Sequence, residues 1–188
     1  MAIKIFIDQG HNPEGVNTGA EGNGLFEQDV TYAVGQYLFD LLSANPNFEA
    51  RLSRPTPETV LGTSNRTSLA ERVYLANSWD ADYFLSIHTN GSTNPNANGT
   101  EVYVYREDSP AYFLGLDILN AIVERMGTEN RGMKINRSLY VLRNTDMPAA
   151  LIELAYISNQ QDSALLRDDP MGFATAIYNG ILRYFGLS

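Results

Sequence analysis

The stretch IFIDQGHNPEG, residues 5–15, decides the fold of this chain. It belongs to an apolar run that begins at Ile3 and changes abruptly to glycine and polar residues around His11. A short run of β-branched and aromatic residues bounded by glycine is typical of a buried strand, so residues 3–8 are predicted to form one. One of the two histidines of the chain therefore lies where this strand is expected to end.

Beyond this stretch, helical and strand patterns alternate along the chain. A helix is expected from Phe26 until SANP at 43–46 ends its apolar spacing, and a second from a Ser68–Glu71 capping box to about Trp79. A third is expected after the N-cap Ser109, and a fourth over about 171–185. The further expected strands are residues 48–55, 82–88, 100–105, LYVL at 139–142 and AALIELAY at 149–156.

This alternation predicts a single three-layer α/β domain. Its centre would be a mostly parallel, twisted sheet of about six strands with helices on both faces. A length of 188 residues without an internal repeat, low-complexity tract or linker favours one domain over 1–188. Ligands of such sheets bind beyond the carboxyl ends of the strands, and both His11 and His88 are expected to end strands at that edge.

The composition excludes several functions. The net charge is −9 and the 13 basic residues are scattered, so neither nucleic acid nor an anionic membrane surface is expected as a partner. No apolar run reaches the length of a membrane span, and the first residues lack the pattern of a secretory signal peptide, so neither membrane insertion nor an export signal is expected. Because there is no cysteine, a metal would have to be held by histidines and carboxylates.

Four residues form a candidate catalytic set: His11, Glu27, His88 and Glu153. Two imidazoles and one carboxylate are a ligand set of catalytic Zn²⁺, which leaves a fourth position for water. Glu153 is a carboxylate within the apolar run PAALIELAYIS, which is costly unless it is paired, bound to a metal or part of an active site. The set therefore predicts a zinc site with a proton-transferring carboxylate beside it.

Each of these residues also has a simpler interpretation when taken alone. A histidine at a strand end is more often a hydrogen-bonded loop or core residue, and Glu27 is a charge favoured at a helix N-terminus. Glu153 could pair with an arginine such as Arg143. Asp8 could be a turn residue or could support His11. The glycine-rich loop after residue 8 lacks both common phosphate-binding motifs, which disfavours a nucleotide site.

Read in chain order, several blocks closely resemble the zinc-dependent N-acetylmuramoyl-L-alanine amidases of the type 3 amidase family, which include autolysins and phage endolysins. The blocks are IDQGHNP, LFEQDV, SLAERVYLAN with ADYFLSIHTNGS, GTEVYVY, RGMKINRSLYVLRNTDMPAALIELAYISNQQD and AIYNGILRYF. The resemblance implies metal ligands at His11, Glu27 and His88 and a catalytic glutamate at Glu153. Departures from the family pattern are Gln9, Asn12, Leu154 and Ala155, which leave the metal and catalytic positions filled.

The resemblance also implies a substrate and a mechanism. The substrate would be peptidoglycan or a muropeptide, cut at the amide between N-acetylmuramic acid and L-alanine of the stem peptide. Zinc would polarise the carbonyl, while Glu153 would take the proton of the attacking water and pass it to the departing amine. Asn90 could orient water or substrate, or could only cap its turn. Another zinc peptidase or carboxypeptidase, or a non-catalytic wall-binding module, remains an alternative.

The same resemblance leads to expectations about the surroundings of the site. Some family members carry a helical insertion that covers the zinc, but the segments after His88 are short here, so an open cleft is expected. The acidic charge gives no affinity for the wall, so a separate cell-wall-binding module is expected outside this chain. The enzyme would act in the cell wall or outside the cell, either exported within a longer protein or released as a phage lysin.

Overall fold

A six-stranded sheet with the order β4-β1-β5-β8-β6-β7 forms the centre of the molecule. The computed structural model describes residues 2–187. Its strands are β1 (Ile3–Gln9), β4 (Phe48–Leu52), β5 (Tyr83–Asn90), β6 (Thr100–Val104), β7 (Asn130–Ile135) and β8 (Ala149–Tyr156). Strands β4, β1, β5 and β8 run parallel to one another. Strand β6 is antiparallel to β8, and the edge strand β7 is parallel to β6.

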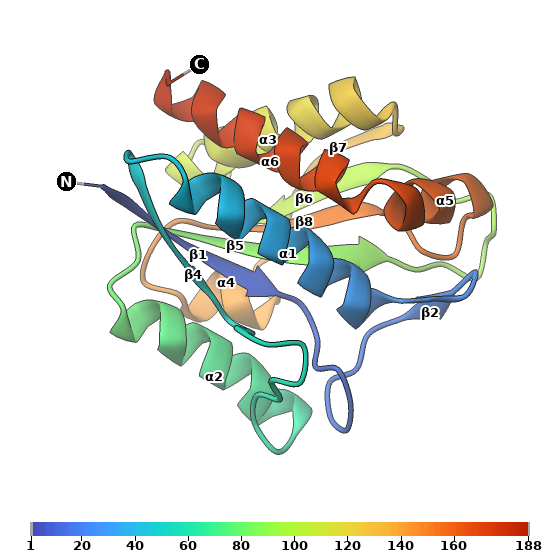
Figure 1. Ribbon diagram of the computed structural model, residues 1–188, viewed down its shortest axis with the longest axis horizontal. Helices are drawn as coiled ribbons and strands as arrows, with labels where there is room; N and C mark the ends of the chain where they lie inside the picture. The colour runs from blue at the N-terminus through green and yellow to red at the C-terminus, as the bar shows by residue number, and fades with distance from the viewer. Residues whose placement is uncertain (1, 188) are drawn as a thin grey trace.

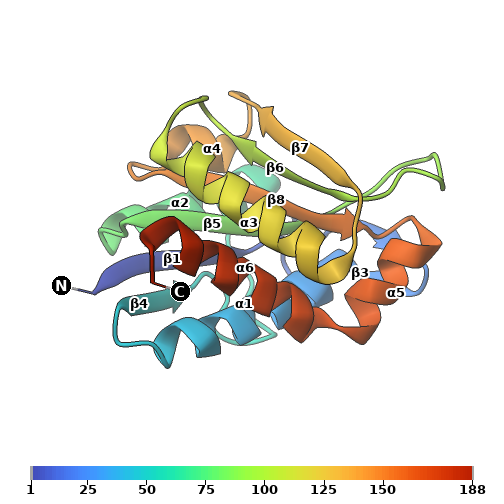
Figure 2. The same ribbon diagram turned by 90° about the horizontal axis from the view of Figure 1, so that it is seen from above.

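Six helices cover the two faces of this sheet. Helices α1 (Glu27–Ser43), α3 (Pro110–Met126) and α6 (Pro170–Phe185) form one layer, and α2 (Asn65–Ser78) and the short α4 (Tyr140–Asn144) lie on the opposite face (Figures 1 and 2). Helix α5 (Gln160–Asp168) follows β8. The prediction of a single three-layer α/β domain with a mostly parallel six-stranded sheet is confirmed.

The alternation of side chains along the central strands explains both layers and the position of the site. Ile5 and Ile7 pack into the core under α1, α3 and α6, whereas Phe6 packs into a second core with α2 and α4. On the α2/α4 face, however, the carboxyl-terminal parts of the strands carry polar residues. Asp8 follows Phe6 by two positions on β1, and His88 and Glu153 occupy the same face of β5 and β8. On this face the sheet therefore has an apolar area, which α2 and α4 cover, and next to it a polar area at the carboxyl ends of the strands.

The three longest predicted helices are present. Helix α3 shows the predicted caps: the Ser109 side chain accepts a hydrogen bond from the main-chain N–H of Tyr112, Pro110 is the first helical residue, and Gly127 ends the helix with a left-handed φ of 69°. In α6 the apolar residues at spacings of four face the core, as expected from the sequence.

Some boundaries differ from the prediction. Helix α2 begins earlier, because the reciprocal capping box is formed by Ser64 and Thr67 and not by Ser68, which is buried within the helix. The segment LYVL lies in and next to α4 and is not a strand. His88 does not end its strand, because β5 continues to Asn90.

Four elements have no counterpart in the prediction: the edge strand β7, helix α5, and the hairpin of β2 (Glu21–Gly22) and β3 (Leu25–Phe26). Each lies in a stretch whose local pattern is mostly polar. The hairpin matters for the site, since it connects the loop of His11 to the first residue of α1. It therefore sets where Glu27 lies.

Candidate active site

Three side chains meet at the carboxyl edge of the sheet, and they are the three predicted metal ligands. The Oε1 atom of Glu27 lies 3.2 Å from Nε2 of His11 and 3.1 Å from Nδ1 of His88. One potential ligand atom from each residue lies within 4.8 Å of the other two. Glu27 is 4% exposed, whereas His11 and His88 are 20% and 19% exposed, so the cluster is buried on its carboxylate side and open on its histidine side.

Glu27 is held by the start of α1, of which it is the first residue. Its Oε1 accepts a hydrogen bond from the main-chain N–H of Thr89 (2.9 Å), and its Oε2 accepts one from Ala20 (2.8 Å). Burial alone would raise the pKa of Glu27, but the hydrogen bonds and charges of His11 and His88 hold it well below the ordinary value of a glutamate. The carboxylate is therefore ionised and fixed at neutral pH.

His11 lies just beyond β1 in a left-handed conformation with a φ of 69°, which a residue other than glycine rarely adopts. Its Nδ1 lies 3.2 Å from the main-chain carbonyl oxygen of Asn17. Because a carbonyl only accepts, this contact is a hydrogen bond donated by Nδ1, and Nε2 is the nitrogen that faces Glu27. The loop thus directs Nε2 of His11 at the centre of the cluster.

A buried arginine fixes the loop that carries His11. Arg72 of α2 donates from Nη1 to Oδ1 of Asp8 and to the main-chain carbonyl of Gln9, both at 2.6 Å, and from Nη2 to the carbonyl of His11 at 2.7 Å. Burial alone would raise the pKa of Asp8, but the charge and hydrogen bond of Arg72 hold it below its ordinary value. Asp8 is thus a strand residue that supports His11 through Arg72, not a turn residue.

His88 packs against the backbone of Gly10. A Cβ atom at Gly10 would lie 2.5 Å from Cε1 and 2.6 Å from Nε2 of the imidazole, which is closer than real Cβ contacts. Only a glycine leaves room for the ring at this position. The sequence break that follows Gln9 therefore allows His88 to reach Glu27.

Glu153 lies directly beside His88 in the sheet, because the two are register partners of the parallel strands β5 and β8. On its other side, its register partner in β6 is Glu101. Its Oε2 is buried and has no hydrogen-bond partner among the described residues, and Arg143 makes no ion pair with it there. Burial, with smaller contributions from the charges of Glu27 and Glu101, raises the pKa of Glu153 to about 8.

A second buried carboxylate, Glu101, was not among the predicted site residues. Its Oε1 accepts hydrogen bonds from Asn90 (2.7 Å) and from the Tyr103 hydroxyl (2.8 Å), and Nε of Arg131 lies 3.1 Å from its Oε2. Asn90 also accepts a hydrogen bond from the N–H of Gly91, so it both caps its turn and holds Glu101. The pKa of Tyr103 is raised by burial and by this carboxylate.

Two of the three separations between the potential ligand atoms match those around a tetrahedral zinc ion, and all three atoms lie within 4.8 Å of one another. At Zn–N and Zn–O distances of about 2.0–2.1 Å, two ligand atoms of a tetrahedron are separated by about 3.3 Å. The distances from Glu27 to His11 and His88, 3.2 and 3.1 Å, are close to this value. The donor set of two imidazoles and one carboxylate is also one that zinc prefers, and three protein ligands leave one position open.

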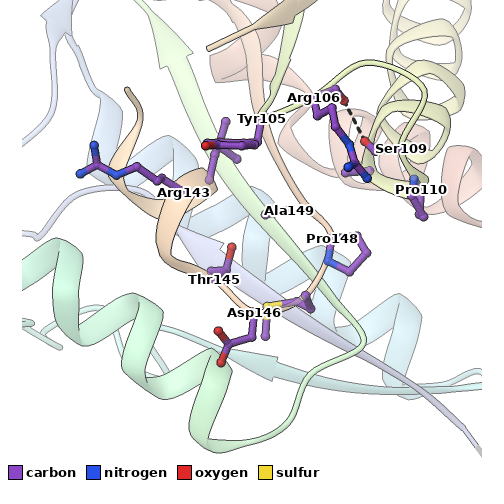
Figure 3. A pocket seen from close by; sticks show the side chains of 12 residues that line it. Tyr105, Arg106, Ser109, Pro110, Arg143, Thr145, Asp146, Pro148 and Ala149 are labelled. Carbon is purple, nitrogen blue, oxygen red and sulfur yellow. Dashed lines mark hydrogen bonds between the residues drawn. The ribbon is translucent and has the colours of Figure 1, made fainter. Parts of the chain in front are cut away.

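Two cavities border helix α4. The smaller, of about 120 Å³, adjoins the cluster and is lined by His11, His88 and Arg72 together with Tyr140 and Leu151. The larger, of about 430 Å³, lies near the amino end of β8, between the end of β6, the start of α3 and the segment that follows α4 (Figure 3). Its lining includes Arg143 and Asp146 but neither histidine, so it is separate from the metal-ligand cluster.

Comparison with known proteins places the chain in one family. Residues 5–183 match the family described as N-acetylmuramoyl-L-alanine amidase, and the chain belongs to that family. It is 37% identical to N-acetylmuramoyl-L-alanine amidase CwlM of Bacillus licheniformis, over 99% of this chain and 70% of that protein. It is 35% identical to N-acetylmuramoyl-L-alanine amidase LytC of Bacillus subtilis, but covers only 35% of that protein.

A solved structure of an N-acetylmuramoyl-L-alanine amidase is also similar to this chain. The catalytic domain of CwlV, an N-acetylmuramoyl-L-alanine amidase from Bacillus (Paenibacillus) polymyxa var. colistinus, is 30% identical with a TM-score of 0.82, over 99% of both chains. The resemblance read from the sequence blocks is thereby confirmed.

Among the described residues, none of the helices combines the length and apolar character that crossing a membrane requires.

Proposed function

We propose that this chain is a zinc-dependent hydrolase that cleaves the amide between the lactyl group of N-acetylmuramic acid and L-alanine of peptidoglycan stem peptides. The observation that carries the proposal is the convergence of His11, Glu27 and His88 beside the unpartnered Oε2 of Glu153. Membership in the amidase family supplies the substrate class. The geometry supplies the groups that the hydrolysis of an amide needs.

His11, Glu27 and His88 would hold the zinc ion. When bound, zinc supplies a Lewis acid that polarises the amide carbonyl and makes water more acidic. Glu27 reduces the net charge of the centre, and its bonds to the N–H groups of Thr89 and Ala20 keep it in place. The two imidazoles form the exposed side of the cluster, where the amide can approach.

Glu153 would move the proton. Hydrolysis adds the oxygen of water to the carbonyl carbon and breaks the bond from that carbon to the nitrogen of L-alanine. Glu153 takes a proton from the attacking water and delivers it to the departing nitrogen, which leaves as an amine. Among the described residues no group bonds to Oε2, so no protein donor competes with the substrate for this oxygen. A cation beside Glu153 would lower its pKa below the value of about 8 that burial produces, which favours its ionised form as the base.

We propose residues 1–188 as the catalytic domain of a protein that acts on peptidoglycan in the cell wall. CwlM and LytC are longer than this chain, which fits a wall-binding module elsewhere in the natural protein. Residues 91–99, which follow β5, form a loop without a helix. This supports the expectation of an open cleft, in which no inserted helix covers the ligands.

The proposal is tested by elemental analysis of the purified chain, combined with mass spectrometry of the products from wall suspensions. About one zinc per chain is expected, with release of peptides that have a free amino group on L-alanine from intact muramic acid. Glu153→Gln should retain zinc and lose hydrolysis by a factor of at least about 100, because general acid–base catalysis contributes about 10²–10⁴. The exposed control Glu107→Gln should behave like the parent. Full activity after complete chelation, or cleavage at another bond of the stem peptide, would overturn the proposal.

A further inference from the structure

The polar face of the sheet continues beyond Glu153 to the edge strand β7. Glu101 of β6 is the register partner of Glu153, and it is 5% exposed with three hydrogen-bond donors around it. One of these donors is Arg131, whose side chain is 36% exposed. The guanidinium of Arg131 thus lies on the same face of the sheet as Glu153, two strands away and next to Glu101. A positive charge at this place is notable because the chain has a net charge of −9.

An irregularity in the sheet brings Arg131 to this face. The register between β6 and β7 shifts between Thr100 and Val102, so two residues of β7, Arg131 and Gly132, lie opposite Glu101. Gly132 has a φ of 82°, in the region that favours glycine. Bulges commonly redirect a side chain next to an active site. Here the bulge directs the guanidinium toward Glu101.

The guanidinium is held on one edge and accessible on the other. Its Nε donates to Oε2 of Glu101, its Nη1 donates to the main-chain carbonyl of Asn98 (3.3 Å), and its Cζ lies 5.1 Å from the ring centre of Tyr156. Nη2 has no hydrogen-bond partner within residues 2–187. These three contacts fix the guanidinium of Arg131 in the free protein. Binding of a ligand to it therefore costs little side-chain entropy.

The separation between Arg131 and Glu153 matches a short piece of peptide. Register partners on antiparallel strands have Cα atoms about 4.5–5.5 Å apart, and the next strand lies about 4.8 Å farther, so the Cα atom of Arg131 is roughly 9–10 Å from that of Glu153. The guanidinium reaches back from there toward Glu101. From the nitrogen of L-alanine, two extended residues span about 7 Å. A substrate whose scissile amide lies at Glu153 can therefore place its second residue at Arg131.

We propose that Arg131 binds the α-carboxylate of the second stem-peptide residue, and so determines a preference for stem peptides in which this group is free over those in which it is amidated. In wall peptides this second residue is a D-glutamate linked through its side chain, so its α-carboxyl remains available. The assignment rests on the proposed amidase function. A receptor is needed there because Glu27 and Glu101 otherwise make this part of the face anionic and would repel a carboxylate. Arg131 neutralises Glu101 and still presents Nη2 to the substrate.

The test compares N-acetylmuramoyl-L-alanyl-D-glutamate with its α-amide, N-acetylmuramoyl-L-alanyl-D-isoglutamine, as substrates of the zinc-loaded chain. The parent should show a kcat/KM about tenfold or more higher for the acid than for the amide, the effect of one hydrogen bond between charged groups. Arg131→Gln should lower kcat/KM for the acid to near that for the amide, mainly through KM. Arg131→Lys should retain part of the preference, because it keeps the charge but loses the planar group.

The control is Arg125→Gln, which removes an exposed arginine from α3 on the opposite face and should keep the parental ratio. Equal kcat/KM of the parent for acid and amide, or an unchanged ratio in Arg131→Gln, would overturn the assignment of Arg131. Equal values in the parent would overturn the assignment even where Arg131→Gln fails to fold, and in that case a partly reduced preference in Arg131→Lys supports it. If the parent cleaves neither substrate and also leaves wall peptides uncut, the proposed function itself is wrong.

Discussion

Arg72 donates a 2.7 Å hydrogen bond to the main-chain carbonyl of His11, a residue 61 positions away in the sequence. The same guanidinium forms a buried ion pair with Asp8, in which both side chains are 1% exposed. The position of His11, a candidate metal ligand just beyond β1, therefore does not depend on its loop alone. Its backbone is attached to helix α2, so the position of His11 depends on the packing of α2 against the sheet.

Replacement of Arg72 should weaken both the fold and the metal site. Arg72→Met leaves Asp8 as an unpaired buried charge, which is expected to cost about 3–5 kcal/mol of unfolding free energy. Arg72→Lys keeps a charge but cannot serve three acceptors, and its zinc affinity should fall by a factor of about 10–100, as for other residues that support metal ligands. Competition with a chromophoric chelator measures the affinity, and urea unfolding measures the stability. Arg66→Lys, exposed on the same helix, is the control; an unaltered zinc affinity in Arg72→Lys would contradict the role of Arg72.

The convergence of the candidate ligands could be predicted because these residues follow strong local patterns. A buried strand, a glycine break and a helix start are visible around His11 and Glu27, and His88 lies in a second apolar strand. In a mostly parallel sheet, these local features are enough to bring the residues to one edge. The fold class and the candidate ligand set followed from them without any knowledge of long-range contacts.

The supporting residues could not be predicted in this way, because their partners are set by tertiary packing. Arg72 occupies the apolar face of α2 beside Leu69 and Val73, and this position was the one signal that it is buried. Glu101 looks like the solvent-facing residue of an alternating strand, yet it is buried under Arg131. The segment LYVL has β-forming residues, but packing against α2 makes most of it helical.

Zinc should stabilise the chain through its two histidines. Binding to the folded state alone adds about 2.7 kcal/mol of unfolding free energy when free zinc is 100 times Kd. A thermal melt should therefore shift upward with zinc and return after chelation. Because the chain has only two histidines and no cysteine, His88→Ala should abolish most of the shift, with no other imidazole to replace it. A shift of parental size in His88→Ala would show that zinc binds elsewhere.

The raised pKa of Glu153 predicts a pH dependence in the metal-free chain. The folded state holds this proton up to a pH of about 8, whereas the unfolded state releases it near the model value of 4.5. The stability is therefore fully present below pH 4.5 and is lost as the pH rises toward 8. Glu153→Gln has no such loss, so in chelator it should be more stable than the parent by roughly 2–4 kcal/mol at pH 9 and nearly equal to it at pH 4.5. Parallel melting curves across this range would disprove the burial of a neutral Glu153.

Gly10→Ala should damage the site through one added methyl group. The new Cβ would lie 2.5 Å from Cε1 of His88 and 2.7 Å from the main-chain oxygen of Ile87, and neither the ring, which faces Glu27, nor the backbone of a central strand can yield easily. The expected cost is about 1–3 kcal/mol of unfolding free energy, as for other overpacked positions, together with a lower zinc affinity. Gly91→Ala is the matched control, since its Cβ would meet its nearest neighbour at 3.6 Å, an ordinary contact.

Because the clash in Gly10→Ala involves the candidate ligand His88 and not only the core, zinc affinity should fall in this variant even at a temperature where it is fully folded. Retention of parental zinc affinity in a folded Gly10→Ala would mean that His88 does not need its observed position to bind the metal.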